Sequence, residues 1–300
     1  MSLVSFVKIP KNDIEFFKRA IAESLDLINH VWPANAKSVV IKPNLCYYWD
    51  YTTGQTTDPK FIAALIDLIR GKTSENVNIS IAEADASAMK CQYAFRMLGY
   101  DELARERNVR LVNLSKEPRE YVDVPIGHKR FHLGVPEVLK YADLRIDVPK
   151  IKYTMEEIKI TCALKNVFGC IPYYKKSRFH PWLSEAIVAA NKAMHFDLCI
   201  VDGGVVSGVE PRWLGLVIAS KDLVSVDCAA AHIASVNASN IRYLRLAEKE
   251  GLGSRRFMAK GESISYFKDR YPHKNVQRKL ISKAYSIVKW TPLTKRLGLG

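Results

Sequence analysis

Short apolar runs alternate with longer amphipathic stretches along most of this 300-residue chain. The short runs have the length and β-branched content of buried strands, and we expect strands at 4–9, 38–42, 77–82, 109–113, 144–148, 197–201 and 216–219. The longer stretches predict helices at 13–30, 59–70, 88–98, 184–195 and 223–236. This alternation predicts an α/β fold with a mainly parallel central sheet flanked by helices.

Two regions interrupt the alternation. Residues 116–136 place three prolines and two glycines around short alternating runs, which predicts a small β-hairpin insertion. Residues 150–180 are rich in lysine and tyrosine, and we expect a long functional loop around a short helix there. Without a repeat or a clear linker, the sequence predicts one α/β domain over residues 1–269 and a basic amphipathic tail at 270–300.

The composition excludes several classes of protein. With 48% hydrophobic and 25% charged residues, the chain has the composition of a globular protein, not of a disordered or collagen-like one. Its longest apolar stretches, such as 61–69 and 223–231, are far shorter than the roughly 20 residues that cross a bilayer. The first ten residues lack the pattern of a signal peptide, so we expect a cytoplasmic protein. Six cysteines without C-x-x-C spacing predict neither a disulfide framework nor a zinc site.

Polar side chains follow four of the predicted strands at the point where each strand ends. In open parallel sheets, ligands bind in the crevice beyond the carboxyl ends of the strands, so these side chains are candidates for one shared site. The alternative is that strand ends are polar only because they reach the surface. The residues concerned are Lys42 and Asn44, Glu83 and Asp85, Lys150 and Lys152, and Asp202 with Gly203 and Gly204.

A second polar cluster lies in the predicted loop. Lys165 and Asn166 are surrounded in the sequence by apolar residues, so we expect their polar ends to occupy a half-buried space. A buried lysine is either paired or has a lowered pKa. Together with the strand-end lysines, Lys165 predicts a cationic pocket for phosphate or carboxylate groups. The basic residues at 175–178 are equally well explained as part of a solvated loop.

Two residues of this loop are candidates for catalysis. His180 suits acid–base chemistry because the ordinary pKa of histidine lies near neutrality. Lys165 is the second candidate, as a lysine whose pKa is lowered by burial. The alternative for His180, which precedes a proline, is a hydrogen-bonded structural role.

Four carboxylates at strand ends or in a predicted buried helix are compatible with Mg²⁺ held by oxygen ligands. They are Glu83, Asp85, Asp202 and Asp227. Alternatively, they are counter-ions of the lysines or helix caps. Gly203 and Gly204 predict a flexible turn able to approach a phosphate group. The chain contains neither G-x-G-x-x-G nor a Walker motif, so a nucleotide-binding fold is not indicated.

Six short segments occur in a fixed order: Lys-Pro-Asn-Leu at 42–45, Thr-Thr-Asp-Pro at 56–59, Val-Pro-Lys-Ile-Lys at 148–152, Leu-Lys-Asn-Val-Phe-Gly at 164–169, Asp-Gly-Gly at 202–204 and Ser-Val-Asp-Cys-Ala-Ala at 225–230. Over residues 38–253 the chain thereby resembles the domain-of-unknown-function 362 family. The resemblance implies an α/β domain whose matching polar residues, Lys165 and Asp227 among them, gather at one site. We expect the substrate to be bound by Lys42, Asn44, Thr57, Asp58, Lys150, Lys152, Asn166, Gly203 and Gly204.

Many members of that family carry a ferredoxin-like iron–sulfur segment with C-x2-C-x2-C-x3-C spacing. This chain lacks that spacing, so we expect no iron–sulfur cluster. The family often has a Gly-Pro pair after the Asp-Gly turn, whereas this chain reads Gly-Val-Glu-Pro-Arg-Trp at 208–213. The ligand specificity of that loop is therefore not carried over.

Much of the net charge of +14 lies at the end of the chain. Residues 270–300 contain eight basic residues and no acidic one, which leaves +6 for residues 1–269. Between 280 and 288 apolar residues recur three or four positions apart, and Trp290 follows them. A basic amphipathic helix of this kind suits an anionic membrane surface. The alternative is a helix packed on the domain.

The sequence favours an enzyme of unassigned reaction that binds a small anionic substrate, placed in the cytoplasm or on the inner face of a membrane. The alternative is a non-catalytic protein that binds an anionic ligand or acts as a scaffold. Nucleic-acid binding through the tail and Tyr-Tyr-Lys-Lys at 173–176 is less favoured because no recognised motif is present. A redox carrier is least favoured, and the oligomeric state is left open.

Overall fold

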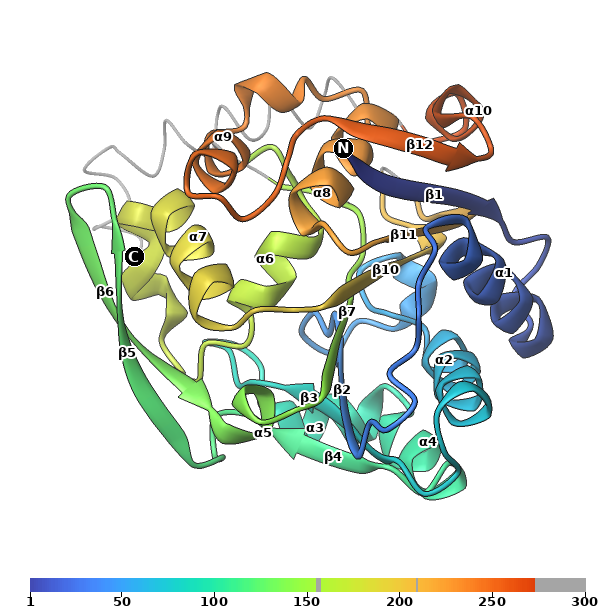
Figure 1. Cartoon of the computed structure of the whole chain (residues 1–300), viewed down its shortest axis with the longest axis horizontal. Coiled ribbons are helices and arrows are strands. Elements are labelled where there is room, and N and C mark those ends of the chain that lie inside the picture. Colours follow the sequence, from blue (N-terminus) through green and yellow to red (C-terminus); the bar gives the residue numbers. More distant parts are fainter. Residues whose placement is uncertain (155–157, 209, 273–300) are drawn as a thin grey trace, which may run out of the picture.

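The chain folds around an eight-stranded sheet (Figure 1). The computed structural model describes residues 1–154, 158–208 and 210–272. The strand order is β12-β1-β11-β10-β7-β2-β3-β4. Neighbouring strands from β10 to β4 are parallel, and β11 runs antiparallel to both of its neighbours. The strands are β1 (Ser2–Lys8), β2 (Ser38–Pro43), β3 (Asn78–Glu83), β4 (Arg110–Asn113), β7 (Leu144–Val148), β10 (Leu198–Val206), β11 (Arg212–Ser220) and β12 (Phe257–Gly261).

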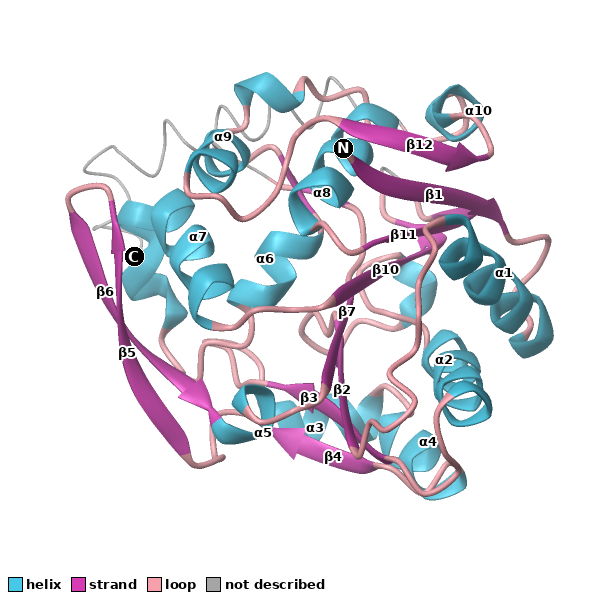
Figure 2. Ribbon diagram, in the orientation of Figure 1, coloured by secondary structure: helices cyan, strands magenta, loops and turns pink. Residues whose placement is uncertain are grey.

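Helices cover both faces of this sheet (Figure 2). One face carries α1 (Ile14–Leu27), α2 (Pro59–Lys72), α3 (Cys91–Met97) and α4 (Tyr100–Glu106). The other carries α6 (Ala163–Phe168), α7 (Leu183–Ala193), α8 (Leu223–Ile233) and α9 (Arg242–Lys249). In β2, Val39 and Ile41 pack on the first side and Val40 on the second, so the strand is apolar throughout. The predicted α/β fold with a mainly parallel sheet is confirmed.

The predicted hairpin insertion is also confirmed. It consists of β5 (Arg119–Ile126) and β6 (Lys129–Pro136), whose apolar side chains join the core on the side of α7. The region 150–180 contains short elements in addition to α6. The remaining short elements of the chain are α5 (Glu137–Lys140), β8 (Lys152–Tyr153), β9 (Ile160–Thr161), α10 (Ile264–Lys268) and the 3-10 turns η1 (Tyr51–Thr53), η2 (Lys176–Trp182) and η3 (Ala238–Asn240).

Gly203 and Gly204 lie inside β10, so their prediction as a flexible turn was wrong. The strand continues past Val201 because β11 pairs with it over this stretch. A Cβ atom on Gly203 would lie 2.7 Å from the carbonyl oxygen of Leu216, which makes a larger residue incompatible with this close pairing. These glycines therefore serve the packing of two strands.

The end of the described chain packs on the body. Tyr271 is buried, and its hydroxyl donates to the carbonyl oxygen of Ile151 at 3.3 Å. The predicted basic amphipathic tail covers 270–300, and its residues 273–300 lie outside the described residues. In the part of the chain that is described, no helix has the length and apolar character needed to span a bilayer.

Candidate functional site

The chain changes direction in the sheet between β2 and β7. From β2 the strands continue outwards through β3 to β4, whereas β7 is followed on its other side by β10. Ligands of doubly wound sheets bind at such a switch point, beyond the carboxyl ends of the strands. A cavity of about 550 Å³ lies there and is lined by residues that follow β2, β3 and β7.

Five lysines line this cavity. Four of them are the lysines that the sequence assigned to one pocket, because the ends of parallel strands and α6 meet here. The fifth, Lys176 at the start of η2, is a residue that the sequence explains equally well as part of a solvated loop. It reaches the cavity because the loop after α6 returns to the ends of the strands, and the sequence does not reveal this path. They are Lys42, Lys150, Lys152, Lys165 and Lys176.

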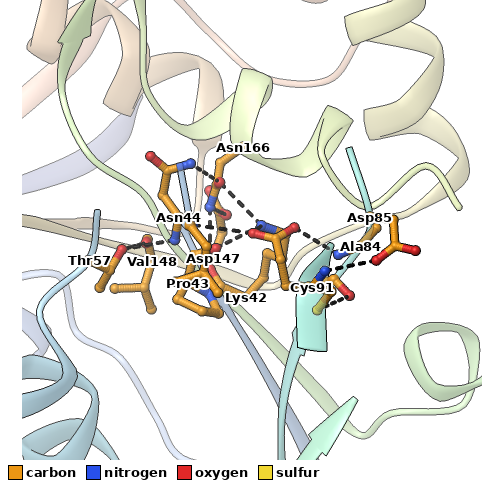
Figure 3. Close-up of polar contacts among 12 residues, drawn as sticks. Lys42, Pro43, Asn44, Thr57, Ala84, Asp85, Cys91, Asp147, Val148 and Asn166 are labelled. Atoms are coloured by element: carbon orange, nitrogen blue, oxygen red, sulfur yellow. Dashed lines mark hydrogen bonds and ion pairs between the residues drawn. The ribbon is translucent and has the colours of Figure 1, made fainter. Parts of the chain in front are cut away.

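Lys42 is held at the end of β2 by a buried ion pair. Its ammonium group lies 2.8 Å from Oε2 of Glu83, and the two side chains are 1% and 5% exposed. It also donates to the carbonyl oxygen of Pro43 at 2.7 Å. Burial acts to lower the pKa of Lys42, but Glu83, Cys170 and Asp147 together outweigh it and the pKa is raised. Lys42 is therefore a fixed, neutralised cation (Figure 3).

Asn166 connects Lys42 to the adjacent strand (Figure 3). Its Oδ1 accepts from Lys42 at 3.3 Å and from Nδ2 of Asn44 at 3.0 Å. Its Nδ2 donates to Asp147 at 2.8 Å. Burial raises the pKa of Asp147 well above its usual value. Asp147 is a part of the site that sequence analysis missed, although it is the one acidic residue in the otherwise apolar end of β7.

Lys150 forms the second buried ion pair, with Asp202 of β10 at 3.0 Å. Asp202 also accepts from the backbone N–H of Asp58, the residue that caps α2. Thr57 accepts from the N–H of Asn44 and donates to the carbonyl oxygen of Val148, which ties β2 to β7. Thr57, Asp58 and Asp202 support the cavity without lining it, as do Gly203 and Gly204.

The other three lysines have no carboxylate partner among the described residues. Lys152 donates to the carbonyl oxygen of Gln55 at 3.2 Å, and Lys176 donates to that of Asp85 at 2.6 Å. Lys165 lies over the ring of Phe168, 4.4 Å from its centre. Burial lowers the pKa of all three, and that of Lys165 to about 8. The cavity thus carries uncompensated positive charge.

Two further polar residues line the cavity. His180 lines it and is exposed to solvent. Asn44 also lines it, and its buried Oδ1 has no hydrogen-bond partner among the described residues. Nearby Tyr47 has a φ of 56°, which is strained for a bulky residue and is common at functional sites.

The four carboxylates proposed as magnesium ligands do not come together. Glu83 and Asp202 neutralise lysines, whereas Asp85 accepts from the N–H of Cys91 at 2.8 Å. Asp227 accepts from the N–H of Ala163 at 2.6 Å and so anchors the start of α6. Burial raises the pKa of Asp227 to about 7. Within the described ranges, no three His, Cys, Asp or Glu residues are grouped as metal ligands would be.

Comparisons with known proteins add a family, one similar sequence and one solved structure. The sequence pattern of the family described as "Domain of unknown function (DUF362)" matches residues 39–232. A thylakoid-associated protein of Synechocystis sp. is 30% identical over 135 residues, which cover 40% of this chain and 41% of that protein. The chain thus matches less than half of that relative's length. The lactate racemase apoprotein of Thermoanaerobacterium thermosaccharolyticum has a TM-score of 0.44 at 14% identity, covering 79% of this chain and 58% of that one.

Proposed function

This chain belongs to the domain-of-unknown-function 362 family, and from that premise we propose that it is an enzyme acting on a small phosphate- or carboxylate-bearing molecule bound in the lysine-lined cavity. The supporting observation is the charge left in the cavity. Lys42 and Lys150 are neutralised by Glu83 and Asp202, but the other three cavity lysines have no acidic partner within the described residues.

An anion would remove the electrostatic cost of this arrangement. Three half-buried ammonium groups repel one another, and burial weakens the screening of that repulsion by water. A phosphate or carboxylate group accepts charge-assisted hydrogen bonds from such groups. The ligand class is therefore a small anion.

Two residues are assigned to proton transfer. Lys165, with a pKa of about 8, exchanges a proton near neutral pH far more readily than an ordinary lysine. His180 lines the same cavity. If a ligand binds but is not turned over, the alternative of a non-catalytic binding protein is favoured. If turnover survives replacement of Lys165 and of His180, the assignment of these two residues is wrong.

Thermal unfolding with a panel of anions tests the binding proposal. The panel contains inorganic phosphate, sugar phosphates, sugar nucleotides and small organic acids. We expect at least one to raise the melting temperature, and Lys152→Met and Lys176→Met each to weaken its binding about tenfold, since each removes a charged hydrogen-bond donor. Lys175→Met is the matched control, because Lys175 is exposed and lies outside the cavity lining. Equal binding by all variants would contradict the proposal.

We propose, secondly, that the protein binds to the anionic face of a membrane through its tail. The supporting observations are the eight basic residues without an acidic one at 270–300 and their interleaved apolar residues. The description of the Synechocystis relative as thylakoid-associated agrees with membrane association. Nucleic-acid binding stays the less favoured use of this charge, and a gel shift with single-stranded RNA tests it.

A further inference from the structure

Lys165 differs from the other lysines of the cavity in the partners of its ammonium group. Lys42 and Lys150 are in ion pairs, and Lys152 and Lys176 donate to backbone carbonyl oxygens. Among the residues that the structure describes, the Nζ of Lys165 has neither a hydrogen bond nor an ion pair, and only the ring of Phe168 lies beneath it. Among these residues no donor forms a hydrogen bond to the lone pair of Nζ, so the neutral amine of Lys165 would be free to react.

The same surrounding favours loss of that proton. Burial lowers the pKa of Lys165 to about 8, and the nearby charges of Lys152 and Lys176 contribute to the shift. At pH 7 roughly a tenth of such amines are neutral, against on the order of a thousandth or less for an ordinary lysine. A lysine that is desolvated and close to another cationic group is an activated nucleophile.

We propose that Lys165 is a covalent catalytic residue that forms an imine with the carbonyl carbon of an oxo acid. This inference rests on the proposed anionic site, and it narrows the substrate to molecules that carry a ketone or aldehyde next to a carboxylate or phosphate. The acid group binds near Lys152 and Lys176, which brings the carbonyl carbon to Lys165.

The chemistry balances without a further reactant. The neutral amine adds to the carbonyl carbon, a C–N bond forms, and the carbonyl oxygen takes up a proton to give a carbinolamine. The hydroxyl group then takes up the proton that the ammonium group of Lys165 released earlier and leaves as water. This gives the protonated imine, whose nitrogen keeps the second hydrogen of the amine. The protonated imine draws electrons from the neighbouring carbon, which eases loss of a proton or of carbon dioxide there.

The cavity thiol of Cys162 is a poorer nucleophile for the same carbonyl. Burial raises the pKa of Cys162 well above its usual value, so little thiolate is present. Asp227 raises it further. Asp227 anchors the start of α6, where both Cys162 and Lys165 lie. Only the Lys165 amine has its pKa shifted towards the reactive, uncharged form.

Reductive trapping tests the proposal on the full-length protein. Glyoxylate is the probe, and cyanoborohydride reduces the imine to a stable carboxymethyl amine that peptide mass spectrometry locates. We expect Lys165 to be labelled at least about tenfold faster than the exposed Lys175, with saturation in glyoxylate and a rate that rises with pH until about 8. Lys165→Arg should lose this label while keeping the positive charge.

Two outcomes separate this proposal from the one on which it rests. If anions stabilise the protein but Lys165 is labelled no faster than Lys175, the covalent role is overturned and the binding site stands. If no anion stabilises it, the proposed anionic site itself fails. Labelling concentrated on Lys152 in both the unaltered protein and Lys165→Arg would also overturn the assignment.

Discussion

Lys150 and Asp202 form an ion pair at 3.0 Å in which each side chain is only 1% exposed. Asp202 is held in turn by the N–H groups of Asp58 and Gly204, at 2.9 Å and 3.0 Å. One carboxylate therefore connects the cavity, the start of α2 and the interior of β10. Attraction between two buried charges roughly offsets the cost of desolvating both, so the loss of either one leaves a large unbalanced cost.

Lys150→Met should lower the free energy of unfolding by about 3–5 kcal/mol, because Asp202 would remain buried without its counter-ion. Urea unfolding at pH 7 measures this. The double variant Lys150→Met with Asp202→Asn should recover a large part of the loss. Lys192→Met is the control, since Lys192 pairs with Glu250 at 2.8 Å but on the surface, where such a pair contributes about 0–1 kcal/mol. Equal losses for Lys150→Met and Lys192→Met would contradict the prediction.

The carboxyl of Asp58 should make stability depend on pH. Burial and the nearby charge of Asp202 raise its pKa from 3.8 to about 6. The folded protein thus holds this proton more tightly than the unfolded chain does. The stabilising contribution is complete below about pH 4 and is lost as the pH rises through about 6.

Asp58→Asn should remove this dependence. Asparagine also caps helices well. Within the described part of the chain, Oδ1 of Asn12 has no partner, and after a turn of the Asn12 side chain it would accept from the amide introduced at position 58. We expect a gain on the order of 2 kcal/mol at pH 8 and no gain at pH 4. Thermal unfolding between these pH values measures it, and a gain that is the same at both would exclude Asp58 as the titrating group.

Lys165→Met should stabilise the protein at neutral pH while abolishing its reactivity. The pKa of Lys165 is lowered from 10.5 to about 8, so folding acts against its charged form. The charged form of Lys165 destabilises the folded protein fully below about pH 8. This effect fades as the pH rises towards 10.5, the pKa of an ordinary lysine. We expect a gain on the order of 1–2 kcal/mol at pH 7 after allowance for screening by water, as found for sites that trade stability for activity. A loss of stability would show that Lys165 has a structural role.

The positions of Lys42 and Lys150 at one cavity could be predicted from the sequence for a simple reason. Apolar runs locate the strands, and parallel strands bring their carboxyl ends to one edge of the sheet. The residue that follows each strand is then fixed in space to within a few ångströms. A different signal located the hairpin, because Pro118 and Pro136 lie at its ends and Gly127 lies in its turn.

Other parts of the site depend on contacts that no local pattern encodes. Lys176 reaches the carbonyl oxygen of Asp85 across 91 positions of the chain, through a loop whose path is set by tertiary packing. Gly203 and Gly204 resemble a turn in isolation, and only their pairing with β11 makes them part of a strand. The sequence likewise could not show which lysines are neutralised. Glu83 and Asp202 look like any other acidic residues in the sequence, and only the fold shows that they pair with Lys42 and Lys150.

The basic tail should carry the binding to anionic membranes. Removal of residues 273–300 should abolish binding to vesicles that contain anionic lipid and leave the melting temperature of the body nearly unchanged. The truncation starts at 273 because Tyr271 is buried and its hydroxyl forms a hydrogen bond with the carbonyl oxygen of Ile151. An earlier truncation would remove this side chain and expose the core. Co-sedimentation with anionic and with neutral phosphatidylcholine vesicles measures the binding, and circular dichroism measures the stability.

Charge and apolar burial should act together in this binding. Each lysine or arginine near an anionic surface contributes about 1 kcal/mol, so replacing Lys279, Lys283 and Lys289 by Glu should weaken binding by several orders of magnitude. Raised salt should weaken it only in part, because screening reduces the attraction but not the burial of apolar side chains. If the full-length protein ignores anionic vesicles at low salt, the membrane proposal fails. If the truncated protein still binds them, the basic surface of the body is responsible, and if it unfolds, the apolar residues of the tail belong to the core.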